Sequence, residues 1–190
     1  MKIKLVSVDG WDKAYFVARN CIGKTDDNTD LIEPPLEWRQ RLLLSNHSPI
    51  RQVMLLFWVE IPNKTQNHIV RHKTADFYVS TLRSDLTGAK DTDITRLTTR
   101  QVAISCNLES FISMCKKRLC RKSELETQKL FEKMVDAFIG ADPNLVGKEF
   151  FRPNCLTCKE LAFGNCLDQR HNESLKTALF LKKELKNGEM

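Results

Sequence analysis

The sequence predicts an α+β fold with a small sheet and several helices. Short stretches of alternating or continuous apolar residues, which are typical of strands, occur at 2–8, 51–61 and 77–82. Between and after them lie segments with apolar residues at helical spacing. With 190 residues, 42% of them hydrophobic, the chain can bury one core. We therefore expect a single domain over 1–190.

The first part of the chain predicts strands separated by short helices. Residues 2–8 alternate with period two and predict a strand. The segment 11–21 has helical spacing, and Asp9 before it can cap the helix. Pro35, at a first helical position, opens a second helix. The run 51–61, "RQVMLLFWVEI", predicts a buried central strand because it is almost continuously apolar.

A short helix and another strand follow. The segment 65–71 can form one or two helical turns, capped by Asn63 or Thr65. The alternating run 77–82 then predicts a strand. The residues between the two are therefore expected to form a helix-to-strand junction.

The remaining segments predict helices. The segment 99–120 is predicted as one long helix, because its apolar residues recur near i, i+3, i+4 and i+7. Ser123 and Glu126 form a capping-box pattern for a helix over 124–139. A charged helix near 173–186 is expected to follow a cysteine-bearing tail at about 150–170.

The charge balance favours an anionic partner. The formal net charge of +6 is typical of proteins that bind nucleotides, flavins, folates or nucleic acid. Aromatic residues do not interleave with the basic ones in a long patch, which makes nucleic acid an unlikely partner. The longest apolar run, 53–59, is far too short for a membrane span, and the alternating start does not resemble a secretion signal. We expect a cytoplasmic protein with no membrane partner.

The seven cysteines predict free thiols or a metal cluster, and not a disulfide framework. Cys115 and Cys120 are expected to pack as small apolar groups. A C-x2-C pair and two further candidate ligands lie in the tail. They allow a structural zinc site as an alternative to ordinary loop thiols, at Cys155, Cys158, Cys166 and His171. We expect ordinary loop thiols in this tail and no bound metal.

Three adjacent basic residues, Arg71, His72 and Lys73, lie at the predicted helix-to-strand junction. Neighbouring positive groups repel one another, so such a triplet usually serves an anion. The alternative is a solvated turn. Flanking cations are expected to lower the pKa of His72 and keep it neutral, which favours a hydrogen-bond donor to a ligand over a general base.

Four segments, taken in order, resemble the flavin-dependent thymidylate synthase family in a short form such as phages carry. They are "ARNC", "SNHSPIRQVMLLFWVEIP", "RHKTADFYVSTLRSD" and "NLESFISMCKKRLCRKSELETQ", the last continuing to "PNCLTCKELAFGNC". The third resembles the family signature, Arg-His-Arg followed further along by Ser-x-Arg. The resemblance spans roughly residues 15 to 170.

The resemblance implies a small antiparallel sheet flanked by helices, and a homotetramer with active sites where subunits meet. It implies methylation of dUMP to dTMP with FAD, methylenetetrahydrofolate and NADPH. In that family the reduced flavin carries the one-carbon unit or hydride, and no cysteine attacks the pyrimidine.

On the flavin side, the resemblance implies contacts from Ser48, Arg71, His72, Lys73 and Asn107. Fixed positive donors stabilise a diphosphate and an anionic reduced flavin. His47, beside Ser48, is either a turn residue or a further flavin contact.

On the nucleotide side, the implied contacts are His68, Arg71, Thr81, Leu82, Arg83 and Arg118. Arg118 is the implied catalytic residue, which polarises the uracil ring by stabilising charge at N3 and the neighbouring carbonyl. A guanidinium suits this task because it stays charged and presents its donors in a planar fork. Asn107 and Arg118 are eleven residues apart, three helical turns, and so are expected on one face of the predicted helix. The other basic residues of the run 116–122 are expected to stay mostly in solvent.

The sequence departs from the family pattern mainly on the nucleotide side. The usual Arg, Glu, Ser, Gly and Gln are replaced by Lys73, Val79, Thr81, Leu82 and His68. A family helix with another nucleotide-binding arginine is largely missing, and either Arg96 or Arg100 is a candidate to replace it.

Three further hypotheses remain open, the first two because of these departures and the third because of the cysteine-bearing tail. One is a variant that makes another 5-substituted pyrimidine nucleotide. A second is a non-catalytic nucleotide or nucleic-acid binding protein on the same scaffold, and a third is a zinc-stabilised interaction module.

Overall fold

The computed structural model of the chain describes residues 1–88, 95–120 and 122–153. The predicted helix near 173–186 lies outside these residues. So do the four candidate zinc ligands of the tail, Cys155, Cys158, Cys166 and His171.

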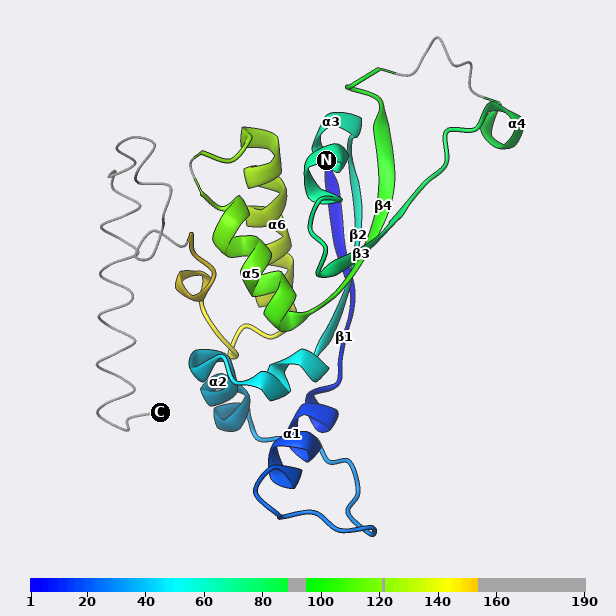
Figure 1. The fold of residues 1–190 in the computed structure, drawn as a ribbon. Coiled ribbons are helices and arrows are strands. Elements are labelled where there is room, and N and C mark those ends of the chain that lie inside the picture. Colours follow the sequence, from blue (N-terminus) through cyan, green and yellow to red (C-terminus); the bar gives the residue numbers. More distant parts are fainter. Residues whose placement is uncertain (89–94, 121, 154–190) are drawn as a thin grey trace.

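The described part of the chain contains a four-stranded sheet with the order β1-β2-β4-β3. Its strands are β1 (Lys2–Asp9), β2 (Met54–Pro62), β3 (Ala75–Val79) and β4 (Thr99–Asn107). Every neighbouring pair runs antiparallel. The predicted class, a small antiparallel sheet with helices, is therefore confirmed (Figure 1).

One face of the sheet forms the core. Phe57 of β2 lies opposite Leu5 of β1 and Ile104 of β4, and Ile104 lies opposite Phe77 of β3. This row faces the helices α5 (Leu108–Arg118) and α6 (Leu125–Ala141), which cover the sheet (Figure 1). The ring of Phe111 on α5 lies 5.2 Å from that of Phe57. The alternation along the strands therefore turns every second side chain toward the two helices.

Shorter helices lie at the ends of the sheet and beyond it. They are α1 (Trp11–Asn20), α2 (Leu36–Ser45), η1 (Ser48–Gln52), α3 (Asn63–Ile69), α4 (Ser84–Thr87) and η3 (Lys148–Phe150). Gly10 joins β1 to α1 with φ +96°, a conformation that favours glycine. A Cβ at this position would lie 2.2 Å from the backbone oxygen of Gln52.

The prediction of one long helix over 99–120 is wrong. The segment divides at Asn107 into strand β4 and helix α5. Val102, Ile104 and Cys106 alternate with exposed or half-exposed neighbours and are buried on the sheet face. Taken together with the apolar residues of α5, these positions also fit a helical spacing. A prediction from periodicity alone therefore merged strand β4 and helix α5 into a single helix.

The predicted helix caps differ from those observed, and Pro35 is the N-cap residue of α2 instead of its first helical residue. Helix α6 is capped by Glu124, whose side chain accepts a hydrogen bond from the Thr127 N–H, and not by Ser123. No side-chain hydrogen bond caps α1 or α3, so the predicted caps at Asp9, Asn63 and Thr65 are wrong.

Some boundaries also move. The central strand begins at Met54 instead of residue 51, because residues 48–52 form η1. Strand β3 covers Ala75–Val79 instead of 77–82. None of the helices described is long and apolar enough to cross a bilayer.

Candidate functional site

The basic triplet lies in the turn that connects α3 to β3. The His72 N–H donates to the Ile69 carbonyl over 3.1 Å, and the Ala75 N–H donates to the His72 carbonyl over 3.4 Å. Arg71 and Lys73 are exposed, whereas His72 is only 9% exposed. The turn therefore presents two cations to solvent and directs the middle side chain inward.

Inside the turn, His72 meets the last residue of α5. Arg118 Nε donates to His72 Nε2 over 2.7 Å, and Arg118 Nη2 donates to the His68 carbonyl over 3.0 Å. The ring of Phe131 on α6 lies 6.4 Å from the His72 ring. The end of α5 and the segment 68–72, which are 46 to 50 residues apart in the sequence, thus place the guanidinium of Arg118 at the end of α3.

The surroundings of this pair hold His72 in its neutral form. Burial lowers the pKa of His72 to about 4, with further contributions from the charges of Arg118 and Lys117. This agrees with the prediction that His72 is neutral, but the cause of the lowered pKa differs from the one expected. Burial has the largest effect, and the contributing cations are Arg118 and Lys117 of α5 instead of the residues that flank His72 in the sequence. Burial also lowers the pKa of Arg118, and the charge of Arg71 adds to the effect.

Four cations gather around His72. Elsewhere, Lys64, Arg51 and Arg83 each form an ion pair with a carboxylate. Within the described residues, no carboxylate pairs with the cations around His72, which are Arg71, Lys73, Lys117 and Arg118. A half-buried guanidinium among such neighbours is suited to binding an anion.

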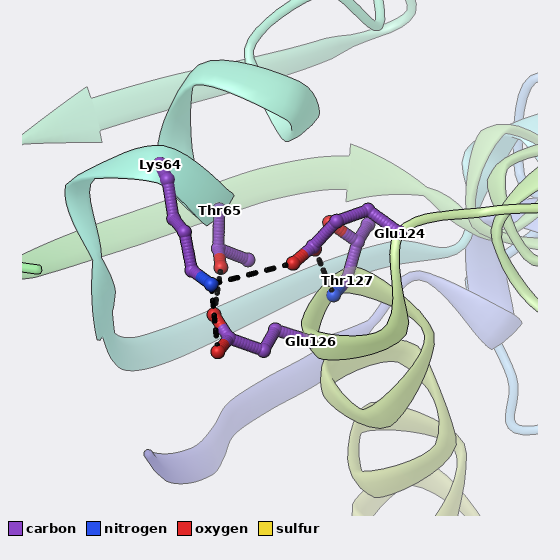
Figure 2. Close-up of polar contacts among 5 residues, drawn as sticks. All are labelled: Lys64, Thr65, Glu124, Glu126 and Thr127. Carbon is purple, nitrogen blue, oxygen red and sulfur yellow. Dashed lines mark hydrogen bonds and ion pairs between the residues drawn. The ribbon is translucent and has the colours of Figure 1, made fainter. Parts of the chain in front are cut away.

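The start of α3 is tied to the start of α6 by a polar cluster (Figure 2). Lys64 Nζ lies 2.8 Å from Glu126 and 3.7 Å from Glu124. The buried Thr65 hydroxyl contacts Glu126 over 3.4 Å, and both the N–H and the hydroxyl of Thr127 donate to Glu124 over 2.8 Å. Helix α3 is thus held at its first turn by α6 and at its last turn by α5.

Two other predicted flavin contacts lie at the opposite end of α5. Asn107 caps this helix, because its Oδ1 accepts a hydrogen bond from the Ser110 N–H over 2.8 Å. Ser48 is exposed at the start of η1, and the ion pair Arg51–Glu109 joins η1 to the first turn of α5 over 2.7 Å.

The length of α5 separates the two groups. Its 11 residues span about 16 Å at 1.5 Å per residue. Asn107, the N-cap residue, and Arg118, the last helical residue, therefore lie at opposite ends of α5, about three helical turns apart. The predicted flavin contacts fall into two groups, with Ser48 and Asn107 in one and the basic triplet in the other.

The predicted nucleotide loop extends beyond β3. Arg83 follows Thr81, whose hydroxyl accepts a hydrogen bond from the Arg83 N–H over 3.1 Å. Leu82 between them is half-buried. In Figure 1, α4 directly after this loop lies apart from α5 and α6. The loop therefore leads away from α5, the helix that ends at Arg118 (Figure 1).

Of the two arginines considered as replacements for the missing one, Arg100 reaches this loop. Its Nη2 donates to the Ser80 carbonyl, while its Nε is buried without a hydrogen-bond partner among the described residues. Arg96 is exposed, and its carbonyl accepts a hydrogen bond from the Lys64 N–H over 3.0 Å. Arg100 therefore supports the backbone at the point where the loop leaves the sheet.

Sequence reasoning missed Lys117, Lys64 and Glu126. For Lys117, its position next to Arg118 in the sequence could have indicated that it lies near the site. Lys64 carried no local signal, and the capping-box pattern of Glu126 did not indicate its ion pair with Lys64, since the two residues are far apart in the sequence. Cys115 is buried as predicted, whereas Cys120 is only partly buried.

Comparison with known proteins supports the fold. No protein-family model matches the sequence, and no curated protein matches it. Two solved structures of the flavin-dependent thymidylate synthase ThyX from Helicobacter pylori, both with FAD and dUMP, match with TM-scores of 0.60 and 0.59. Both are 15% identical in sequence, and each match covers 76% of this chain and 97% of the other.

A third match is the UMP/dUMP methylase PolB from Streptomyces cacaoi, bound with 5-Br dUMP. Its TM-score is 0.56 at 18% identity, and the match covers 76% of this chain and 92% of the other. At these identities the likeness shows the fold alone. The chain has a ThyX-like fold.

Proposed function

We propose that this protein methylates dUMP to dTMP, with FAD as its cofactor and methylenetetrahydrofolate and NADPH as co-substrates. The observation that carries the proposal is that Arg71, Lys73, Lys117 and Arg118 gather around the buried His72, and that no carboxylate among the described residues pairs with them. It occurs in a fold whose solved neighbours hold FAD and dUMP.

The donors of this turn fit an anionic cofactor. Arg71 and Lys73 are exposed on either side of the buried His72, so both are free to meet the diphosphate of FAD. When bound, FAD would supply the redox chemistry and carry the one-carbon unit.

Arg118 would act on the pyrimidine. Its two protein acceptors are a neutral imidazole and a carbonyl, so its positive charge remains available to a ligand. It would stabilise negative charge that develops at N3 and the neighbouring carbonyl of the uracil ring.

A homotetramer with shared active sites would complete the substrate site. Arg83 lies after β3, on the side of the molecule that carries α4, and α4 is apart from α5 (Figure 1). In this proposal, the Thr81–Arg83 loop of one subunit reaches the nucleotide held by Arg118 of another.

The visible absorbance spectrum of the purified protein tests the proposal, first with added FAD and then with dUMP and UMP titrated separately. We expect flavin bands that shift on addition of dUMP, and a dTMP product once methylenetetrahydrofolate and NADPH are present. The variant Arg118→Met should keep the flavin bands and shift them only at much higher concentrations of dUMP than the wild type requires. A colourless protein that responds to neither ligand would contradict the proposal.

The second candidate is a non-catalytic nucleotide-binding protein on the same scaffold. The ion pair between Arg83 and Asp85 favours it, because Asp85 occupies a guanidinium that a nucleotide would need. This protein would respond to dUMP without producing dTMP. A variant enzyme that makes another 5-substituted pyrimidine would instead consume dUMP and release a different product, which mass spectrometry would identify.

A further inference from the structure

We propose that His72 positions Arg118 and does not itself contact the flavin or the nucleotide. The proposal replaces the cofactor contact expected for His72 with a role in orienting the guanidinium. It rests on the proposed function, since Arg118 is useful as a ligand only if a nucleotide binds.

The side chain of His72 is hydrogen-bonded to Arg118 and faces the protein interior. The Nε2 atom accepts the hydrogen bond from Arg118 Nε over 2.7 Å, so the neutral ring carries its proton on Nδ1. The side chain is buried between the α3–β3 turn, the end of α5 and the ring of Phe131. Arg71 and Lys73, in contrast, are exposed on either side of it. The middle residue of the triplet is therefore the one that faces the protein.

Two acceptors hold Arg118 in place. His72 Nε2 accepts a hydrogen bond from Arg118 Nε, and the His68 carbonyl accepts one from Arg118 Nη2 over 3.0 Å. A guanidinium has five N–H donors in a fixed plane, so these two bonds set the direction of the remaining ones, including those of Nη1. Fixing the plane in advance reduces the ordering that a bound ligand would otherwise require.

The chemistry of the acceptors explains why a histidine is useful here. A carboxylate in place of His72 would orient Arg118 equally well, but it would neutralise the charge that an anionic ligand needs. A neutral imidazole and a carbonyl orient the guanidinium and leave its charge intact. The groups around His72 are consistent with this role, because α5 contributes Arg118 and Lys117, α6 contributes the apolar ring of Phe131, and Arg71 acts on Arg118.

A double-mutant cycle on the full-length protein tests the proposal. It uses His72→Leu, which removes the acceptor and keeps an apolar side chain of moderate size, and Arg118→Met, which removes the guanidinium and keeps the chain length. The affinity for dUMP is measured in the presence of FAD, and the urea midpoint of unfolding is measured without ligand. His72→Gln, which offers an amide oxygen as acceptor, is the rescue variant. Lys133→Ala, on the exposed side of α6, is the control.

We expect His72→Leu to weaken dUMP binding by about tenfold or more, the scale of a lost hydrogen bond to a charged group. His72→Gln should recover most of this loss. In the Arg118→Met background, His72→Leu should have no further effect on affinity. Additive effects of the two substitutions would overturn the proposal, because they would mean that His72 contacts the ligand directly.

The unfolding measurement keeps this result separate from the proposed function. The shift of the urea midpoint caused by His72→Leu should be smaller in the Arg118→Met background than in the wild type, whether or not the protein is able to bind a nucleotide. Equal shifts in both backgrounds would overturn the pairing itself. Unequal shifts in a protein that binds neither FAD nor dUMP would uphold the pairing, and the proposed function together with the positioning role would fail.

Discussion

Asp85 binds the guanidinium of Arg83 with both of its carboxylate oxygens, at 3.0 Å from Nε and 2.5 Å from Nη2. Both side chains are exposed, at 68% and 57%. The pair lies where the chain leaves β3 and enters α4, in the loop that we propose reaches a nucleotide in a neighbouring subunit. A nucleotide phosphate would therefore compete with Asp85 for the same donors.

Removing this competition should tighten nucleotide binding. An exposed ion pair contributes little free energy, so we expect Asp85→Asn to lower the Kd for dUMP by at most about fivefold. Isothermal titration in the presence of FAD measures the effect. Asp76→Asn, on the exposed side of β3, removes the same charge and should leave the Kd unchanged. Weaker binding by Asp85→Asn would mean that the carboxylate orients Arg83 for the ligand.

The buried His72 should make stability fall in mildly acidic solution. The unfolded chain binds a proton near the usual pKa of 6.5, whereas folded His72 binds one only near a pKa of about 4. Lowering the pH between these values therefore favours the unfolded state, and the loss reaches at most about 3 kcal/mol near the lower value. The contribution of His72 is fully present above pH 6.5.

Urea unfolding across this pH range measures the loss. His72→Leu should flatten the pH dependence, whereas His47→Gln, which removes an exposed histidine before η1, should not. Parallel curves for the wild type and His72→Leu would rule out a buried neutral imidazole at this position.

Two glycines should respond in opposite directions to the same substitution. Gly10→Ala should destabilise the protein by more than about 1 kcal/mol, because φ is +96° and the added Cβ would meet the Gln52 oxygen at 2.2 Å. Gly140→Ala adds a Cβ that meets nothing within 4 Å near the end of α6, and should stabilise by about 0.5 kcal/mol. Thermal unfolding of both variants provides the comparison, and a stable Gly10→Ala protein would contradict the close approach of η1 to β1.

The aromatic core should be the most sensitive part of the domain. The fully buried Phe111 on α5 contacts the rings of Phe57, Phe138 and Phe151. Phe111→Ala should lower the free energy of unfolding by about 3–5 kcal/mol. Leu125→Ala, at a position of α6 that is 61% exposed, should change it by less than about 0.5 kcal/mol. Similar losses for the two variants would contradict the packing of α5 on the sheet.

Local sequence patterns predicted most of the elements but not all of their boundaries. Strand β1 and helices α1 and α2 follow from alternation, from helical spacing and from the Pro35 that directly precedes α2, each a signal local to one element. The strand β4 was missed because Val102, Ile104 and Cys106 satisfy two periodicities at once. Asn107, which caps α5 through the Ser110 N–H, was the one local signal that could have separated strand from helix.

The site depends on contacts that no local pattern contains. The sequence indicated that the triplet serves an anion, but it gave no means of distinguishing the buried His72 from its exposed neighbours. That distinction depends on Arg118, 46 residues away, and on Phe131 beyond it. The polar cluster of Lys64 and Glu126 depends in the same way on the packing of α3 against α6.

Helix α5 connects the two groups of predicted cofactor contacts. Its length therefore limits where the chain can tolerate insertions and deletions. Deleting one residue within 108–118 would rotate Arg118 by about 100° relative to Asn107 and shorten the helix by about 1.5 Å. Arg118 would then no longer face His72, although every remaining side chain would be unchanged. Insertions and deletions should therefore be tolerated in the exposed loop between α1 and α2, and selected against in α5 even at its solvent-facing positions.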